Sequence, residues 1–470
     1  MTFISIPFAI LFLVTAISIY IFKEKKQRHL ILLFASYVFY AWWDIRFLFL
    51  LISQTFVAYA FARMIEKDEK RKKMYMIMGT IIPLAVLGFF KYFNFFRSTI
   101  TEALNLRASD ALNIILPIGI SFYTFQAISY LIDVYRGKLN ARDSFVEVSL
   151  YISFFPQLVA GPIVRASEFL PQLDVNHEIT RANVEEGIQI FLTGMFKKTV
   201  IADRLAVCVD AVYAAPAAYD APSIIMAAIS YSMQIYCDFS GYSDMAIGVA
   251  KFFGYDLCKN FDLPYQAKNP SEFWKRWHIS LSSWLQDYLY ISLGGNRKGR
   301  VRTYINLMLT MLLGGLWHGA DWSFVAWGGI HGLGLVVHKL TFGRKKRKTS
   351  GLKEHNEPIV LTLVCMLLNS AFATLCWIFF RAQSIGDAII VLKRIFTWSG
   401  GVHYIFVYTI IYGVLLLAVH MIMYFKNNGH AFAIKLPLDK WIGRFLIILE
   451  IFVIMIFAYG GDTAFVYFQF

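Results

Sequence analysis

Charge is scarce in this sequence. Asp, Glu, Lys and Arg make up only 16% of its 470 residues, whereas 58% are hydrophobic and the mean hydropathy is +0.54. This composition excludes an ordinary water-soluble globular protein, in which about a quarter of the residues are charged. Because a soluble fold cannot keep so many apolar side chains away from water, the sequence predicts an integral membrane protein.

Cysteine is scarce as well. The five cysteines are scattered singly through apolar sequence without CxxC spacing: Cys208, Cys237, Cys258, Cys365 and Cys376. Neither a disulfide framework nor a zinc site has this pattern. We interpret the cysteines as small core residues and expect no metal.

Long apolar runs are present instead. Residues 3–22, 359–380 and 404–425 are each about as long as a helix that crosses ~30 Å of hydrocarbon. With the other apolar stretches they predict an all-α, polytopic integral membrane protein with roughly 10–12 membrane helices. The first run has no basic segment before it and no small-residue cleavage site after it, so we interpret it as a retained span and not as a signal peptide.

The formal net charge is +14, and the placement of the basic residues indicates topology. They cluster in short connections between apolar runs, at residues 23–28, 67–73 and 344–348. The positive-inside rule predicts that these loops face the cytosol and contact anionic lipids, so we expect no nucleic-acid partner. Since no soluble segment of domain size separates the runs, residues 1–470 are expected to form a single membrane domain.

Residues 231–250 place two carboxylates in an apolar helix. On a helical wheel, Asp238 and Asp244 share a face with small and polar residues, while bulky apolar residues occupy the other side. A carboxylate is costly at membrane depth, so we expect both to face a helix partner or a water-filled cavity. Two roles remain open: packing through buried hydrogen bonds, or lining a substrate path.

Residues 269–300 have the pattern of an amphipathic helix at the membrane interface. Aromatic and apolar residues lie on one side of the wheel, and Lys275, Arg276 and Gln286 lie on the other. Asn269 can cap this helix, and the Pro that follows suits a first turn. His278 falls at the edge of the apolar side, so we expect it to point into the membrane or the protein interior.

A second histidine interrupts the apolar residues 310–324. His318 ends a hydrophobic run and is followed by Gly319, which predicts a break in the helix. A broken helix at membrane depth is tolerated where it is buried in protein or lines a cavity. Imidazole is also suited to proton transfer near neutral pH. The spacing alone is equally compatible with a packing residue and with a catalytic one.

Seven motifs along the chain resemble the membrane-bound O-acyltransferase superfamily, and within it the bacterial alginate O-acetyltransferase branch. They occur in the family's order at residues 115–137, 154–165, 236–248, 273–296, 314–332, 377–382 and 465–470. The resemblance implies a ring of membrane helices around a central tunnel, with re-entrant or interfacial helices in a catalytic region at about residues 269–332. It also implies that His318, in "LWHG", is catalytic and that His278, in "RWH", is the second site residue.

Further expectations follow from this resemblance. Trp277 and Trp317, beside the two histidines, are candidate tunnel residues together with Asp238 and Asp244. No bound cofactor is expected, and acetyl-CoA is the expected acyl donor. Its phosphates would be held at the cytosolic face by a basic rim: Lys275, Arg276, Arg297, Lys298 and Arg300.

The expected protein is a multi-pass acetyltransferase of the bacterial plasma membrane. It would move acetyl groups from the cytosol for O-acetylation of an extracytoplasmic polysaccharide, such as an alginate-like glycan or peptidoglycan. A separate periplasmic or surface acetyltransferase would be its partner. Two alternatives stay open: D-alanyl transfer to teichoic acid from a carrier protein, and a proton-coupled transporter that uses Asp238, Asp244, His278 and His318.

The charge pattern makes a testable prediction about topology. Residues 23–28 and 344–348 should lie on the same, cytosolic, side of the membrane. Single cysteines placed in the two loops of an otherwise cysteine-free protein should both resist an impermeant thiol reagent added outside intact cells. Labelling of one loop alone from outside would show that the topology is wrong.

Overall fold

The computed structural model describes residues 1–104, 112–342, 358–425 and 436–460. Within these ranges the regular elements are helices, with one isolated bridge between Tyr219 and Val402. The predicted all-α class is therefore confirmed. The basic residues 344–348 and the last of the seven motifs, residues 465–470, lie outside the described residues.

The chain divides into two compact units, each assembled from separate stretches. Unit 1 consists of Met1–Met195, Tyr242–Cys258 and Lys435–Ile448. Unit 2 consists of Phe196–Gly241, Lys259–Ile434 and Leu449–Phe470. The expectation of a single domain stays a prediction.

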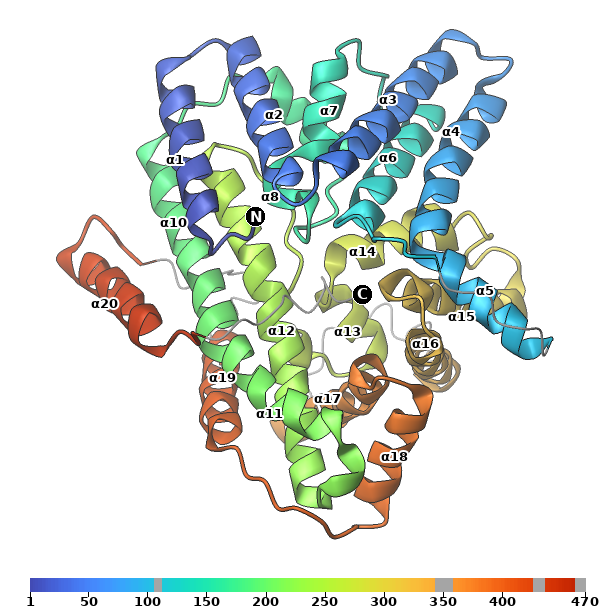
Figure 1. Cartoon of the computed structure of the whole chain (residues 1–470), viewed down its shortest axis with the longest axis vertical. Helices are drawn as coiled ribbons and strands as arrows, with labels where there is room; N and C mark the ends of the chain where they lie inside the picture. The colour runs from blue at the N-terminus through green and yellow to red at the C-terminus, as the bar shows by residue number, and fades with distance from the viewer. Residues whose placement is uncertain (105–111, 343–357, 426–435, 461–470) are drawn as a thin grey trace. The chain divides into compact units, whose positions relative to one another are not determined.

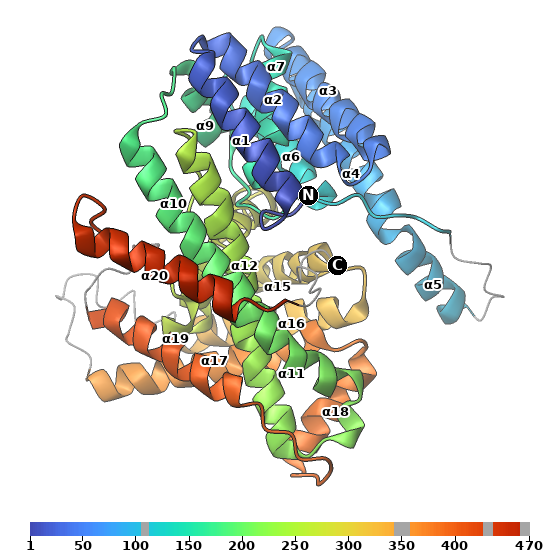
Figure 2. The ribbon, with the colours of Figure 1, turned by 60° about the vertical axis from the view of Figure 1, so that its left-hand side comes forward.

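Unit 1 contains most of the N-terminal helices. They are α1 (Ile6–Ile21), α2 (Lys25–Ala41), α3 (Ile45–Lys67), α4 (Lys72–Leu87), α5 (Phe93–Ala103), α6 (Ile120–Tyr135), α7 (Phe145–Ser153), α8 (Phe155–Leu158), α9 (Ala166–Phe169) and nearly all of α10 (Arg181–Phe196). In both overall views α2 lies beside α1 and α7, while α3 packs against α4 and α6 (Figure 1, Figure 2). Almost every residue of α6 is buried, which makes this helix the centre of the unit.

Unit 2 contains most of the C-terminal helices, among them those on either side of the two histidines. They are α11 (Asp203–Ala214), α13 (Pro270–Arg276), α14 (Ile279–Trp284), α15 (Gly299–His318), α16 (Trp322–Phe342), α17 (Ile359–Arg381), α18 (Ile385–Phe396) and α19 (Val407–Phe425). Two helices, α12 (Ala221–Phe252) and α20 (Trp441–Phe457), contribute to both units. Within unit 2, α15 packs along α16, and α16 packs against α13 and α17.

Four helical segments of the described residues are long and apolar enough to cross a membrane. They are Ile45–Lys67, Lys72–Ala103, Ile359–Arg381 and Val407–Tyr424. The apolar run at residues 3–22 forms α1, which at 16 residues is shorter. Many large apolar side chains of these helices are exposed, as expected for surfaces that face lipid. The chain is an integral membrane protein, and the number of spans stays a prediction.

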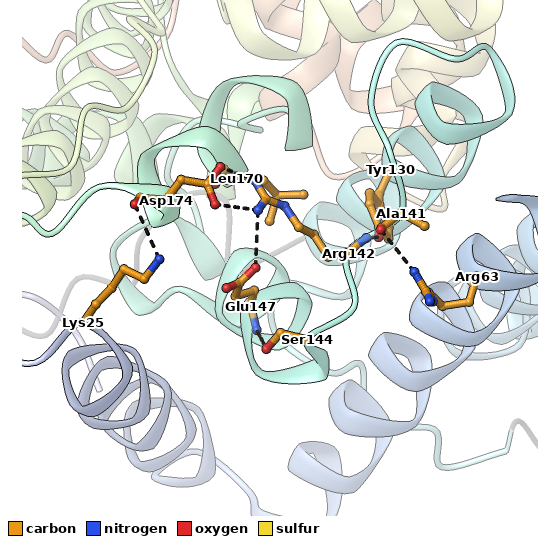
Figure 3. A network of polar contacts seen from close by, with 9 residues as sticks. All are labelled: Lys25, Arg63, Tyr130, Ala141, Arg142, Ser144, Glu147, Leu170 and Asp174. Carbon is orange, nitrogen blue, oxygen red and sulfur yellow. Dashed lines mark hydrogen bonds and ion pairs between the residues drawn. The ribbon is translucent and has the colours of Figure 1, made fainter.

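A polar cluster ties together one end of unit 1 (Figure 3). Arg142 donates two hydrogen bonds to the carboxylate of Asp174, at 2.6 and 2.8 Å, and a third to the carbonyl of Leu170 at 2.9 Å. The Glu147 carboxylate lies 3.5 Å from the same guanidinium. These contacts join the connection after α6 to α7 and to the short 3₁₀ helix Leu170–Asp174, beside a cavity of about 570 Å³.

The Arg142 cluster should stabilise the fold in a pH-dependent way. Hydrogen bonds from Arg142 lower the pKa of Asp174 in the folded protein. The pair therefore stabilises the fold fully when the pH is above about 3.9, the pKa of an aspartate in the unfolded chain. This stabilisation is lost as the pH falls through the lower pKa of the folded state. Because both side chains are partly solvated, we expect Arg142→Gln to cost about 1 kcal/mol at neutral pH. Thermal unfolding in detergent, followed by tryptophan fluorescence, measures this cost, which should shrink below about pH 4.

The exposed pair between Arg181 and Glu185 provides the control, because it joins residues of a single helix. Arg181→Gln should change stability by less than about 0.5 kcal/mol at any pH. An equal effect of the two substitutions would contradict a specific role for Arg142.

Candidate active site

The chain breaks sharply at His278. Asn269 caps α13 as predicted, since its side-chain oxygen accepts a hydrogen bond from the backbone N–H of Glu272 at 2.9 Å. The prediction of one continuous amphipathic helix is wrong, because α13 ends at Arg276 and His278 takes a left-handed conformation with φ of +44°. A residue with a Cβ atom adopts this region only where the surroundings compensate for the strain.

The compensation comes from residues 260–262. The backbone N–H of Asp262 donates to the carbonyl of Arg276 at 2.9 Å, and the N–H of Ile279 donates to the carbonyl of Asn260 at 2.9 Å. Backbone groups on both sides of the break therefore have partners. The helical pattern resumes as α14 and continues into a π-helix, Leu285–Tyr290.

The segment that contains α13 and α14 keeps one apolar and one polar side despite the break at His278. Phe273, Trp277 and Leu281, from the apolar side of the wheel, are buried, whereas Lys275 and Gln286 are exposed. The sides of the helix were therefore predicted correctly, although the apolar side faces other protein residues. The candidate tunnel residue Trp277, for example, stacks on Phe273 with ring centroids 5.6 Å apart.

His318 is the last residue of α15, and Gly319 continues in an extended conformation, so the predicted break is confirmed. The close approach of α15 to α16 depends on glycine. A Cβ atom on Gly315 would lie 2.2 Å from the carbonyl oxygen of Phe324, and one on Gly328 would lie 2.3 Å from that of Met311. Small residues thus let the two backbones touch.

The structure brings the two predicted histidines together. The ring centroids of His278 and His318 are 6.3 Å apart, and the residues are 0% and 5% exposed. The candidate tunnel residue Trp317 contacts both rings, at 6.0 Å from His278 and 5.0 Å from His318. Trp327 and Phe380 also lie against His318, with centroids at 5.0 and 5.4 Å. The pair therefore lies in an aromatic enclosure within unit 2.

His278 has a polar partner that the sequence did not reveal. Its Nδ1 lies 3.1 Å from the side-chain oxygen of Asn260, a fully buried residue. The ring also packs nearly perpendicular to that of Phe239, with centroids 4.7 Å apart. Asn260 stands in a loop with no recognisable spacing to His278, so no signal in the sequence pointed to it.

Asp238 has the helix partner that its burial required. Its carboxylate lies 2.5 Å from the ammonium nitrogen of Lys198, which also lies 2.7 Å from the carboxylate of Asp203. All three residues are buried, and Lys198 belongs to the π-helix Lys197–Ala202. The sequence signal missed here was a lysine followed five residues later by an aspartate within apolar sequence. Asp244 is buried as well, but it belongs to unit 1.

A third histidine lies in the same aromatic cluster. The ring centroid of His331 lies 5.0 Å from those of Trp274 and Trp327. Neither of its ring nitrogens has a hydrogen-bond partner in the described part of the chain. Among the residues that the structure describes, no three His, Cys, Asp or Glu side chains are arranged to hold a metal ion.

The residues of the expected basic rim lie at the surface. Lys275, Arg297, Lys298 and Arg300 are exposed, while Arg276 is half-buried and pairs with Glu272 at 2.9 Å. The start of α15 and the end of α16 lie together, because the ammonium group of Lys339 donates to the side-chain oxygen of Asn296 at 2.9 Å. Arg297, Lys298 and Arg300 therefore stand where the start of α15 meets the end of α16.

Comparison with known proteins shows clear relationships. Residues 138–375, which include both histidines, match the profile described as MBOAT, membrane-bound O-acyltransferase family. A probable alginate O-acetylase of Pseudomonas aeruginosa is 40% identical over 408 residues, covering 85% of this chain and 75% of that protein. A peptidoglycan O-acetyltransferase of Helicobacter pylori is 39% identical over 406 residues (80% and 75%). A teichoic acid D-alanyltransferase of Streptococcus thermophilus is 29% identical over 259 residues (50% and 61%).

The buried ion cluster around Lys198 predicts a large loss of stability on substitution. Lys198→Met would leave the carboxylates of Asp203 and Asp238 without their shared cation, at a cost of roughly 3–5 kcal/mol. The neighbouring Lys197 is only half-buried, so Lys197→Met serves as the matched control with a smaller expected cost. Thermal unfolding of the purified variants in one detergent measures both. Equal stability of the two variants would mean that the cluster is not a structural ion pair.

Proposed function

Because the chain belongs to the membrane-bound O-acyltransferase family, we propose that it acetylates the hydroxyl groups of an extracytoplasmic polysaccharide with acetyl groups taken from the cytosol. The chain is an O-acyltransferase embedded in a membrane, which favours an enzyme over the transporter alternative. Relatives named as alginate and peptidoglycan O-acetylating proteins match at least 80% of the chain at 39% and 40% identity, whereas the D-alanyltransferase matches half of it. These values favour acetate and a glycan acceptor. The proposed location is the bacterial plasma membrane.

One observation carries the chemical part of the proposal: two buried histidines stand 6.3 Å apart at two backbone breaks. In the proposed reaction, His318 removes the proton from an acceptor hydroxyl as its oxygen attacks the thioester carbonyl. The new C–O bond forms, the C–S bond breaks, and the proton passes to the departing thiolate. His278 accepts a hydrogen bond from another polar group of the bound donor or acceptor. The aromatic enclosure limits the water that would otherwise hydrolyse the thioester.

The proposed donor is acetyl-CoA, held at the cytosolic face. Its phosphates cannot enter hydrocarbon without a large desolvation cost, so only the acyl arm would reach the histidines. The exposed rim residues Arg297, Lys298 and Arg300 suit these phosphates. They stand at the start of α15, which the contact between Lys339 and Asn296 brings close to the end of α16. The basic residues 344–348 follow α16 in the sequence, and the positive-inside rule predicts a cytosolic position for them.

The acceptor side is proposed to involve a second protein. A periplasmic or surface acetyltransferase would receive the acetyl group and place it on the glycan. The acceptor hydroxyl at His318 would then be a side chain of that partner or a hydroxyl of the glycan itself.

The proposed role of His318 predicts a separation of activity from folding. His318→Ala should leave the yield and monodispersity of the purified protein nearly unchanged and lower acetyl transfer by roughly 10²-fold or more. His420→Ala is the matched control, because His420 is buried and donates to the carbonyl of Leu416 in its own helix. The measurement is transfer of label from acetyl-labelled CoA by protein in nanodiscs, per unit of folded protein. Parental transfer by a well-folded His318→Ala variant would refute the assignment.

The same assay separates acetate from D-alanine. Protein in nanodiscs is offered either labelled acetyl-CoA or a carrier protein that bears a D-alanyl thioester. Turnover of acetyl-CoA alone is the expected result. Turnover of the D-alanyl carrier alone would overturn the proposed donor and leave the acyltransferase assignment standing.

A further inference from the structure

Asn260 lies where it can control the protonation of the His278 ring. Its side-chain oxygen Oδ1 is 3.1 Å from His278 Nδ1 and 2.9 Å from the hydroxyl of Ser280. All three residues belong to unit 2, and all are buried. Solvent therefore does not compete for these hydrogen bonds.

The orientation of the Asn260 amide follows from a third contact. The backbone N–H of Ser280 also donates to Asn260 Oδ1, at 3.4 Å. A backbone N–H is always a donor, so the atom that it faces is the carbonyl oxygen of the amide and not its nitrogen. Because that oxygen can only accept, His278 Nδ1 is the donor in the 3.1 Å contact. The Ser280 hydroxyl also lies 3.5 Å from Nδ1, but it donates to Asn260 over the shorter distance of 2.9 Å.

The backbone holds Asn260 in place independently of its side chain. Its carbonyl accepts from the N–H of Ile279, and Asp262, two residues later, donates to the carbonyl of Arg276. Both ends of the break at His278 are thus attached to residues 260–262. A change of the Asn260 side chain removes none of the atoms that form these backbone bonds.

From this geometry we propose that Asn260 is a positioning residue that keeps the proton of the neutral His278 ring on Nδ1, which leaves Nε2 as the proton-accepting nitrogen. A neutral imidazole carries one proton, and the partner of one ring nitrogen decides the state of the other. Nε2 lies on the side of the ring away from Asn260. In the acyl transfer proposed above, on which this role in catalysis rests, Nε2 accepts a hydrogen bond from another N–H or O–H group of the bound donor or acceptor, while His318 takes the single proton of the attacking hydroxyl.

The position of the proton can be measured without any activity assay. Protein with ¹⁵N-labelled histidine in lipid bilayers gives ring nitrogen signals that distinguish the two neutral forms, and loss of one set in His278→Gln identifies this residue. The parent protein should show the Nδ1–H form of His278. In Asn260→Leu the leucine side chain cannot accept a hydrogen bond, so the Nδ1–H form should no longer be the main neutral form. An Nε2–H form in the parent would overturn the proposal, and this measurement does not depend on whether the variant folds.

Kinetics provide the second readout. Asn260→Leu should lower kcat by roughly 10-fold to 100-fold, the scale found when a metal-binding histidine loses the partner that orients it. Asn260→Asp keeps an acceptor oxygen and should recover most of the activity. Its carboxylate stabilises the protonated ring, so the acid limb of the pH–rate profile should move to higher pH.

Asn306→Leu is the matched control. Asn306 is also fully buried, but its side-chain nitrogen donates to the carbonyl of Gly295 at 3.1 Å. This substitution should leave the His278 signals and the pH–rate profile unchanged. Unaltered His278 signals in a folded Asn260→Leu variant would overturn the role of Asn260. A parent protein with the Nδ1–H form and no acetyl transfer would contradict the proposed function alone.

Discussion

The need to hydrogen-bond every buried backbone group is the constraint on which the candidate site depends. In the protein interior no bulk water replaces a missing partner, so a buried helix can break only where other protein groups bind the freed N–H and C=O groups. At His278 these groups come from residues 260–262. The same short segment carries Asn260, whose side chain contacts the His278 ring. Residues 260–262 therefore both bind the backbone groups freed at the break and hold the imidazole ring of His278 in place.

The position of His318 depends on a second constraint, the close packing of two helices. Gly315 and Gly328 let the backbones of α15 and α16 touch, and bulky aromatic residues fill the space that remains around the ring. The two histidines are thus held by different interactions. His278 is held by hydrogen bonds with residues 260–262 across the helix break, and His318 is held by the close packing of α15 on α16. Substitutions that alter either contact would change the distance between the rings without removing any reactive group.

The few charges in unit 2 and unit 1 are used in different ways. Lys198 and its carboxylate partners are buried, so each charge depends on the others to remain in the interior. Arg142 and Asp174 are partly solvated and act mainly as a connection between chain segments. The low overall charge of the sequence follows from this arrangement, because a lipid-facing surface carries almost no charge and the interior admits charge only in matched groups.

The sequence by itself determined the features that depend on composition or on neighbouring residues. The all-α membrane class follows from the excess of apolar residues, the start of α13 from the capping side chain of Asn269, and the end of α15 from Gly319. The tertiary structure alone decided the break at His278, because a left-handed histidine has no local signal and is stabilised by bonds to residues 260–262. The partnerships with Asn260 and Lys198 have the same origin, since burial in a low-dielectric interior selects partners by proximity in space and not along the chain.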